Sequence, residues 1–501
     1  MRAFKSLATC IPLWLILAAH VGSSDIWFQG NVGPYAVVVQ IVPAGVVPGI
    51  ALVRVRVPGS DVETVSIQAD KYDATGATPP AEATVRDAAD RDLFTGKLWV
   101  MTAGSNSVIV NVTGRAGKGS VTIPVMIVAE RQLEFSGAIE KILMAAGVFL
   151  FVGLVSIVGA AVRESTLTPG SPATPETRAR ARRVMALSVL LMSAALFGGW
   201  KWWSAEDEAY EKTMFRPLSA KTAVENGLIS VRIDDSTWLK RHDTLWLDDR
   251  SESRWSPLVE DHGKLMHMFA VRDDMSGFAH LHPATTDTVQ FSAPFPELPA
   301  GRYRIFGDIV HESGFAQTLT DSLEVSSSHV ASATGNPDDS WFSGAVGSGP
   351  SRMDVGDGMT IEWRSPGNLR ARAPVSLTFE ARDAKGEYAV LEPYMGMAGH
   401  AVIQRSDGSV FVHLHPMGTV SMASRMAYEM REPGDTINGR LGKRIAGMDH
   451  GALSAMTPGA VSFPYAFPKP GSYRIWVQFK QNGRIHTAAF DALVADSVAA
   501  D

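Results

Sequence analysis

The C-terminal half of the chain contains one stretch of sequence twice. Residues 263–283 and residues 396–416 align without a gap, and matched arginine, aspartate, phenylalanine and proline positions accompany three matched histidines. The matched pairs are His267 with His400, His280 with His413, and His282 with His415. One further pair, His262 over Met395, joins two side-chain types that bind metals. Because self-similarity at a fixed spacing is the signature of a repeated structural unit, we expect a duplicated module.

The two copies lie within longer segments of strand-like sequence. Short runs of valine, isoleucine and aromatic residues end at Gly, Pro, Asn or Asp, and the Tyr-Arg-Ile of residues 303–305 recurs at 473–475. Runs bounded in this way predict a β-sandwich for each copy. We expect module A at residues 221–328, a Ser/Gly/Pro/Asp-rich linker at 329–352, and module B at 353–501.

Residues 25–136 have the same alternating character and contain no histidine, so they predict a third sandwich without an evident chemical site. The expected fold class is therefore mainly β, with three β-sandwich (immunoglobulin- or cupredoxin-like) domains and a two-helix transmembrane hairpin.

The hairpin is predicted from two apolar runs within residues 137–203. Residues 142–162 are 21 uncharged residues and residues 184–200 are 17, enough to cross a bilayer core. The loop between them carries five arginines, which favours a cytoplasmic position, and three tryptophans (Trp200, Trp202 and Trp203) end the second run, as expected at an interface. Residues 204–220 are expected to be a polar linker. A helical hairpin buried in a soluble core is the alternative.

Residues 1–24 combine Arg2 and Lys5 with an apolar run and small residues, the pattern of a secretory signal peptide, although an uncleaved anchor stays open. We therefore expect a multi-pass protein of a bacterial cytoplasmic membrane, with the large domains on the extracytoplasmic side.

The net charge of −6 and the lack of a basic block exclude a nucleic-acid partner.

Two resemblances follow from these segments. The runs PYAVVVQIVPAGVVPG and LFTGKLWVMTAGSNSVIVNVTG resemble the FixH/YtkA-like extracytoplasmic β-domains, which implies a link to copper handling and oxidase assembly. The duplicated HLHP stretch resembles a predicted secreted or membrane-bound bacterial family with two such β-domains after a membrane segment, which implies no particular activity.

The matched histidines are candidate metal ligands. Side chains alternate between the faces of a strand, so the two histidines of each HLH sequence share a face, and the histidine of the preceding strand can approach them across a hairpin. Neutral imidazole is the commonest protein metal ligand. The alternative is that the histidines are internal fasteners that only hydrogen-bond. The candidates are His267, His280 and His282 in module A, and His400, His413 and His415 in module B.

Methionine favours copper among the metals. Met395, Met397 and Met417 flank the module B histidines and are further candidate ligands, and the only cysteine, Cys10, lies in the signal segment. Thioethers beside imidazoles suit Cu(I) better than zinc or hard cations. An insertion at 417–459 carries Met422, Met426 and Met430 on one predicted helix face, and such a stripe is more often a packing face than a row of ligands.

These features predict a membrane-anchored extracytoplasmic protein that binds copper and serves its handling or delivery, with an envelope protein or a metal-receiving protein as partner. The first alternative is a structural or protein-binding envelope module. The second is a copper-dependent oxidoreductase; the sequence contains no catalytic motif, and whether the chain is an enzyme stays open at this point.

The predicted topology can be tested with reporter fusions. A reporter placed in the arginine-rich loop at residues 163–183 should behave as cytoplasmic, and one at the C-terminus should behave as exported, because arginine-rich loops stay inside. The opposite pattern would contradict every extracytoplasmic assignment.

Overall fold

The computed structural model describes residues 25–497, with gaps at 60, 72–78, 134–135, 166, 169, 237, 240–255, 327–334, 346–350, 365–366, 433–438 and 449–456. The predicted signal peptide at 1–24 lies outside the described residues, as do a strand-like run at 244–248 and Met456 of the insertion. Two compact units are present: residues 128–215 form one, and the remainder of the chain forms the other. The chain is mostly β, with a two-helix apolar hairpin and several β-sandwich-like domains, as the sequence predicts.

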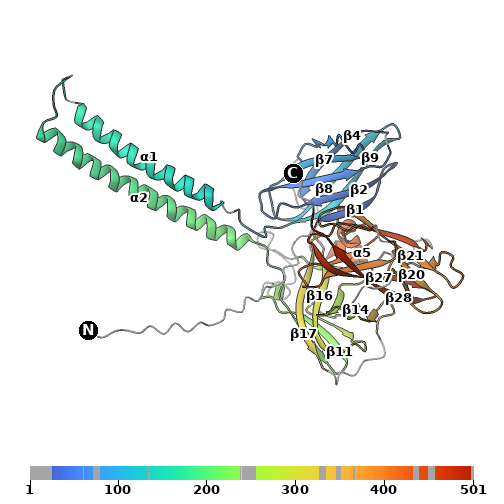
Figure 1. Cartoon of the computed structure of the whole chain (residues 1–501). Helices are drawn as coiled ribbons and strands as arrows, with labels where there is room; N and C mark the ends of the chain where they lie inside the picture. The colour runs from blue at the N-terminus through green and yellow to red at the C-terminus, as the bar shows by residue number, and fades with distance from the viewer. Residues whose placement is uncertain are drawn as a thin grey trace, which may run out of the picture. The chain divides into compact units, whose positions relative to one another are not determined.

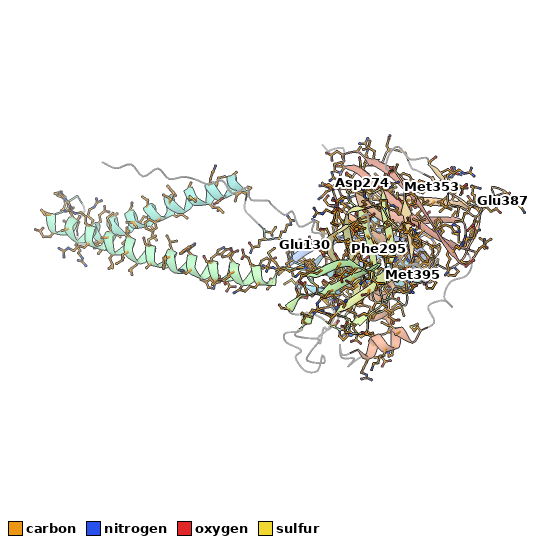
Figure 2. All side chains as sticks on the ribbon, turned by 90° about the horizontal axis from the view of Figure 1, so that it is seen from below. Glu130, Asp274, Phe295, Met353, Glu387 and Met395 are labelled. Carbon is orange, nitrogen blue, oxygen red and sulfur yellow. The ribbon has the colours of Figure 1, made fainter. Side chains whose placement is uncertain are left out.

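The helical unit is an antiparallel pair. Helix α1 (Gly137–Glu164) begins at the cap Ser136, and α2 (Pro175–Thr213) begins at the cap Thr174 with a proline in its first turn. Both are long and apolar enough to cross a membrane, with mean hydropathies of 2.6 and 1.6 over their best windows. The two helices run side by side (Figure 1), and their side chains project outward along the pair (Figure 2); many large apolar residues of both helices are exposed.

Helix α2 is longer than the sequence analysis predicts, because its last turns extend through the first half of the expected linker at 204–220. This segment is rich in alanine and glutamate, which favour a helix, and Lys212 pairs with Glu208 at a spacing of four residues.

The N-terminal sandwich consists of two antiparallel sheets, ordered β1-β2-β3-β7-β6 and β5-β4-β8-β9. Valine and isoleucine of the two inner faces form one core. The strands are β1 (Ile26–Val32), β2 (Tyr35–Val42), β3 (Gly49–Arg56), β4 (Val62–Lys71), β5 (Glu82–Ala83), β6 (Val85–Arg86), β7 (Leu93–Val100), β8 (Gly104–Gly114) and β9 (Gly117–Ile127).

Module A has a sheet β10-β11-β15 and a larger sheet β12-β16-β13-β14-β18, to which β17 is added through β16. Its strands are β10 (Ala220–Glu225), β11 (Leu228–Ile233), β12 (Leu258–Val259), β13 (His267–Arg272), β14 (Gly277–Leu281), β15 (Gln290–Pro294), β16 (Gly301–His311), β17 (Ala316–Val325) and β18 (Ser340–Ser343).

Module B repeats this order in the sheets β19-β20-β21-β26 and β24-β23-β27-β28, with a short β22-β25 pair. Its elements are β19 (Arg352–Asp354), β20 (Thr360–Arg364), β21 (Val375–Arg382), β22 (Val390–Leu391), β23 (His400–Arg405), β24 (Phe411–Leu414), α4 (Met422–Glu429), α5 (Arg440–Ala446), β25 (Thr457–Pro458), β26 (Ala460–Tyr465), β27 (Gly471–Gln481) and β28 (Arg484–Val494).

Part of the predicted inter-module linker at 329–352 is ordered into module A. Strand β18 pairs with β14, so that Ser340 lies opposite His280 and Phe342 opposite Phe278. The sequence Ser-Trp-Phe-Ser contains two aromatic residues, which are common in strands, but the run is only four residues long and lies in a Gly/Pro-rich segment, so the sequence alone does not mark it as a strand.

The two modules contact each other through equivalent aromatic residues. Phe278 of module A stacks on Trp476 of module B, with ring centroids 4.8 Å apart. Phe411, the counterpart of Phe278, stacks in turn on Phe306, the counterpart of Trp476, with centroids 3.8 Å apart. Two contacts that exchange the copies in this way define a local two-fold relation between the modules.

Polar contacts follow the same two-fold relation. His280 Nδ1 lies 2.9 Å from Gln478 Oε1 of module B, and its counterpart His413 places Nδ1 3.4 Å from Asp308 of module A, the counterpart of Gln478. Arg474 of module B is buried and donates to the carbonyl of Met275 in the module A hairpin turn. The duplicated halves therefore form an internal dimer within one chain.

The insertion of module B packs against module A. Met426 of α4 is buried in a cluster with Val259 and Val310 of module A and with Leu441 and Ile445 of α5, and Met422 and Met430 pack against this cluster. The methionine stripe of the insertion is thus part of a hydrophobic contact, which is the packing interpretation of the sequence pattern.

Strand β1 of the N-terminal sandwich reaches module B. Trp27 is buried in the module B core, and the backbone N–H of Gln29 donates to the carbonyl of Met417 at 2.7 Å. Gly418 has a positive φ of 115°, and a Cβ there would lie 2.0 Å from the carbonyl oxygen of Trp27. Glycine is required at this position because the two backbones approach so closely.

The aromatic interface can be tested by truncation. Trp476→Ala removes a fully buried ring and should lower the free energy of unfolding by about 3–5 kcal/mol, since both transfer energy and packing are lost. Trp341→Ala removes a ring that is 53% exposed and should change it by no more than about 0.5 kcal/mol. Thermal melts of the full chain in detergent measure both, and equal effects would contradict the interface.

Candidate metal centre

Each HLH sequence is held in place by a matched hairpin. In module A, Phe269 of β13 pairs with His280 of β14, and in module B, Val402 of β23 pairs with His413 of β24. Alternation then places the second histidine of each HLH on the same face as the first. The face carrying these histidines in each module is the one that bears the aromatic contacts to the other module, so the histidines are buried between the modules.

The two hairpin turns use the same side-chain contacts. Asp274 accepts from the backbone N–H of Ser276 at 3.0 Å, and Asp407 accepts from that of Ser409 at 2.9 Å. In each turn the aspartate also pairs with the arginine that precedes it by two residues. These short-range contacts fix the register, which in turn fixes the face on which the histidines lie.

The first group of histidines lies entirely in module A. His267, His280 and His282 can each offer a ring nitrogen within 4.8 Å of the other two, and all three rings are buried. Nδ1 of His267 lies 3.2 Å from Nε2 of His280. The convergence expected from the hairpin is therefore present. We call this group site 1.

The remaining ring nitrogens of site 1 face hydrogen-bond acceptors. His267 Nε2 lies 3.1 Å from the carbonyl of Asp261, and His282 Nδ1 lies 2.9 Å from a carboxylate oxygen of Asp339. His280 Nδ1 faces Gln478 of the other module, as described above. Histidines that bind metals are oriented in this way, with one nitrogen toward the metal and the other donating to a carbonyl or carboxylate.

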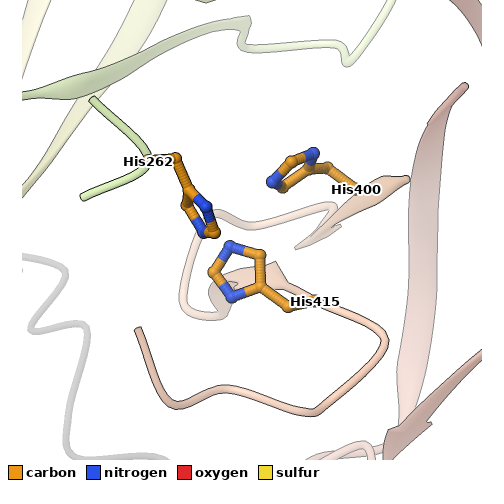
Figure 3. A group of neighbouring side chains, drawn as sticks. All are labelled: His262, His400 and His415. Atoms are coloured by element: carbon orange, nitrogen blue, oxygen red, sulfur yellow. The ribbon is translucent and has the colours of Figure 1, made fainter. Parts of the chain in front are cut away.

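The second group combines residues of both modules. His400 and His415 of module B converge with His262 of module A, again with one nitrogen each within 4.8 Å of the others (Figure 3). The His262 ring centroid lies 5.7 Å from that of His400 and 5.2 Å from that of His415. We call this group site 2. His413, predicted as the third ligand here, is not in the group.

His413 lies between the two groups. Its ring centroid is 5.5 Å from those of His267 and His280, and 4.5 Å from that of His415. Its Nε2 has no hydrogen-bond partner among the described residues. The structure thus assembles seven histidines into one continuous cluster, where the sequence predicts two separate sites of three.

Site 2 has fewer supporting contacts than site 1. Both ring nitrogens of His400 and of His415 are buried, and in the part of the chain that the structure describes neither ring has a hydrogen-bond partner. A buried polar group without a partner costs free energy. Four adjacent buried nitrogens without hydrogen-bond partners are expected in a metal site, but not in histidines that serve only to hydrogen-bond.

Burial and mutual proximity keep these imidazoles neutral. Desolvation, followed by the charge of neighbouring histidines, holds the pKa well below 6.5 for His280, His282, His400, His413 and His415. Burial also lowers the pKa of His267. Neutral imidazole is the form that binds a metal, so the cluster is in its ligating state at neutral pH.

Burial shifts the pKa values of two nearby carboxyls in the opposite direction. Burial raises the pKa of Asp308 and of Asp339 to about 6. For Asp261, burial acts to raise the pKa, but the adjacent His262 and the hydrogen bond from the Ala423 N–H outweigh it, and the pKa is lowered. Asp261 therefore remains an anion beside the cluster, and it also accepts from the Ala423 N–H at the start of α4 at 2.8 Å.

The methionines predicted as ligands have different surroundings. Met395 and Met397 belong to one tight turn and are 8% and 7% exposed. Met417 follows His415 but packs against the core of the N-terminal sandwich, and its backbone carbonyl accepts from Gln29. Met417 is thus engaged in contacts between domains.

Several residues of the site are not evident from sequence. Asp339 lies in the predicted linker, and Gln478 and Tyr394 have no sequence motif. Tyr394 is fully buried, with Oη 3.4 Å from His280 Nδ1 and donating to the carbonyl of Asp338 at 2.8 Å. Among the site residues that the sequence analysis did not name as ligands, only His262 could have been suspected, because it aligns with Met395. His311 and His486 lie outside both groups and bond to backbone carbonyls.

A comparison with protein-family models supports the duplication. A model described as "Domain of unknown function (DUF8832)" matches residues 223–327 and 353–496. Each matched segment holds one HLH sequence. The duplication deduced from the histidine stretch is consistent with this match. A search of curated proteins returns no match.

Solved structures resemble the chain only distantly. An engineered protein is 25% identical over 18% of this chain and 20% of its own length, with a TM-score of 0.15. Dimeric latent PorU from Porphyromonas gingivalis is 9% identical over 92% of this chain and 34% of its own, with a TM-score of 0.13. A structure described as a putative membrane anchored protein from Corynebacterium diphtheriae is 9% identical over 95% of this chain and 98% of its own length, with a TM-score of 0.15.

The lowered pKa values predict a pH dependence for the metal-free chain. A histidine in the unfolded chain binds a proton below about pH 6.5, whereas the buried rings do not. The free energy of unfolding should therefore be highest above that pH and decrease below it. The raised pKa values of Asp308 and Asp339 have the opposite effect, because their buried carboxylates cost stability above about pH 6. The histidines with lowered pKa values outnumber these two carboxyls, so their effect should dominate.

Thermal melts of the metal-free chain between pH 7.5 and pH 5 test this, with Tm decreasing as the pH falls. A variant with His400→Asn and His415→Asn should give a flatter profile. A Tm that is constant or rises on acidification would contradict the expected direction.

Proposed function

We propose that the chain is a membrane-anchored protein that binds transition-metal ions between its duplicated modules, and that it serves the handling or delivery of copper. The observation that carries the proposal is site 1, where three converging imidazoles each turn their other nitrogen to an acceptor: the carbonyl of Asp261, the amide of Gln478 and the carboxylate of Asp339. That arrangement fixes both tautomer and ring orientation before a metal binds.

The alternative of histidines as fasteners accounts less well for site 2. A fastener stabilises by hydrogen bonds, yet neither His400 nor His415 has a hydrogen-bond partner within the described residues. Adding a metal ion there would compensate nitrogens whose burial otherwise costs free energy. The metal proposal therefore explains an energetic feature that the fastener proposal leaves as a cost.

The ligand set supports a first-row transition metal. Imidazole suits zinc, copper, iron and nickel, whereas magnesium and calcium prefer oxygen ligands. Copper is the metal we propose, because methionines flank the histidines in the sequence and the only cysteine is in the N-terminal segment. The histidines of both sites are at most 5% exposed, which favours binding and transfer of an ion over reaction with a large substrate.

The anchor is the α1–α2 hairpin. Its composition supports two spans with the arginine-rich loop on the cytoplasmic side, which would place the modules outside the cytoplasm of a bacterial cell. An ion bound there would be available to extracytoplasmic proteins, and a metal-receiving envelope protein is the proposed partner.

The proposal predicts the metal content of the purified chain. Full-length protein in detergent, loaded with copper and desalted, should carry two ions per chain by elemental analysis, one for each site. A variant with His280→Ala and His282→Ala should carry one, as should a variant with His400→Ala and His415→Ala. Loading with zinc in parallel measures the preference between metals.

The control is His486→Ala, which removes a buried histidine outside both groups and should leave the content unchanged. Melting curves of every variant show whether it is folded. Folded wild-type protein that retains no copper or zinc would eliminate the proposed function and leave the histidines as fasteners.

A further inference from the structure

The tight turn that carries His262 has a counterpart in module B. Residues 261–264 form a two-residue turn with φ of 53° at His262 and 75° at Gly263. Residues 394–397 form the same turn, with φ of 50° at Met395 and 78° at Gly396. Two consecutive positive φ values identify both as type I′ turns, so His262 and Met395 occupy equivalent backbone positions.

His262 lies at a site of the other module. It belongs to module A, yet it converges with His400 and His415 of module B (Figure 3). The local two-fold relation exchanges His400 with His267 and His415 with His282. Applied to the turn, it places Met395 of module B beside His267 and His282 of module A, which is site 1.

A direct contact supports this placement. Tyr394, the residue before Met395, extends its hydroxyl to 3.4 Å from His280 Nδ1 of site 1 and donates to the carbonyl of Asp338 in module A. The turn of module B thus reaches the site 1 histidines. Met395 itself is 8% exposed, so its side chain is enclosed.

We infer that Met395 supplies a thioether ligand to site 1, so that each site takes one ligand from the opposite module. Site 1 then has three imidazoles and one thioether, and site 2 has three imidazoles. A soft thioether favours Cu(I), whereas an all-imidazole set also suits divalent ions. The two sites should therefore differ in metal preference: site 1 is selective for Cu(I), and site 2 accepts Cu(II) or Zn(II). This inference rests on the proposed metal-binding function.

The assignment alters the interpretation of the thioethers around module B. From sequence, Met395 and Met397 are predicted to surround the module B histidines. In the folded chain, the exchange of turns directs Met395 to the histidines of module A. The Cu(I) preference should accordingly belong to site 1, which also has the better-supported imidazoles.

The test uses full-length protein in detergent, loaded with one equivalent of Cu(I) under anaerobic conditions. X-ray absorption should show sulfur as well as nitrogen around the copper. Met395→Leu should abolish the sulfur contribution and weaken Cu(I) binding at least about tenfold in competition with a chelator, the low end of the loss known for supporting residues of metal sites. Zn(II) binding at site 2 should be unchanged.

Two variants are matched controls. Met397→Leu removes the other thioether of the same turn and should retain the sulfur signal. Met395→His converts the turn to the residue that module A uses at this position, and should keep copper bound with nitrogen ligands only. Met395→His places histidine at a φ of 50°, close to the 53° that His262 adopts in module A, so this variant adds no backbone strain.

The outcomes separate this inference from the proposed function. Copper bound to nitrogen alone in the wild-type chain would eliminate the thioether ligand while leaving the metal function in place. A sulfur signal that persists in Met395→Leu and disappears in Met397→Leu would also overturn the assignment. Failure of the wild-type chain to bind Cu(I) or Zn(II) at all would overturn both.

Discussion

The packing of the two modules against each other determines most of what the chain can do. The stacked pairs Phe278–Trp476 and Phe306–Phe411 bury the same face of each module. That face also carries the HLH sequences, so aromatic packing removes the histidines from water and brings both sets together. Burial then lowers their pKa values and leaves nitrogens of His400 and His415 without partners in the described part of the chain.

Much of the fold follows from local sequence. Alternating apolar residues and turn residues mark the strands, and the hairpin turns at Asp274 and Asp407 fix the side on which each HLH sequence lies. The sequence therefore predicts the convergence of His267, His280 and His282. Helix α2 extends further than predicted, because apolar runs show where a span is but helix propensity decides where the helix ends.

The exchange of residues between modules could not be predicted, because it depends on how two folded surfaces meet. Alignment of His262 with Met395 shows that both turns hold a metal-ligand type, but not which histidines each turn approaches. Asp339 could not be predicted as a site residue for a related reason. It lies in a segment with the composition of a linker, and only the pairing of β18 with β14 brings it to His282.

The fusion of both copies into one chain has an evolutionary consequence. A symmetric dimer of identical subunits must carry the same ligand in both of its equivalent sites, because any substitution appears twice. Within a single polypeptide each copy is encoded separately, and one turn can hold histidine while the other holds methionine. Covalent duplication thus permits two adjacent sites with a common framework to specialise independently.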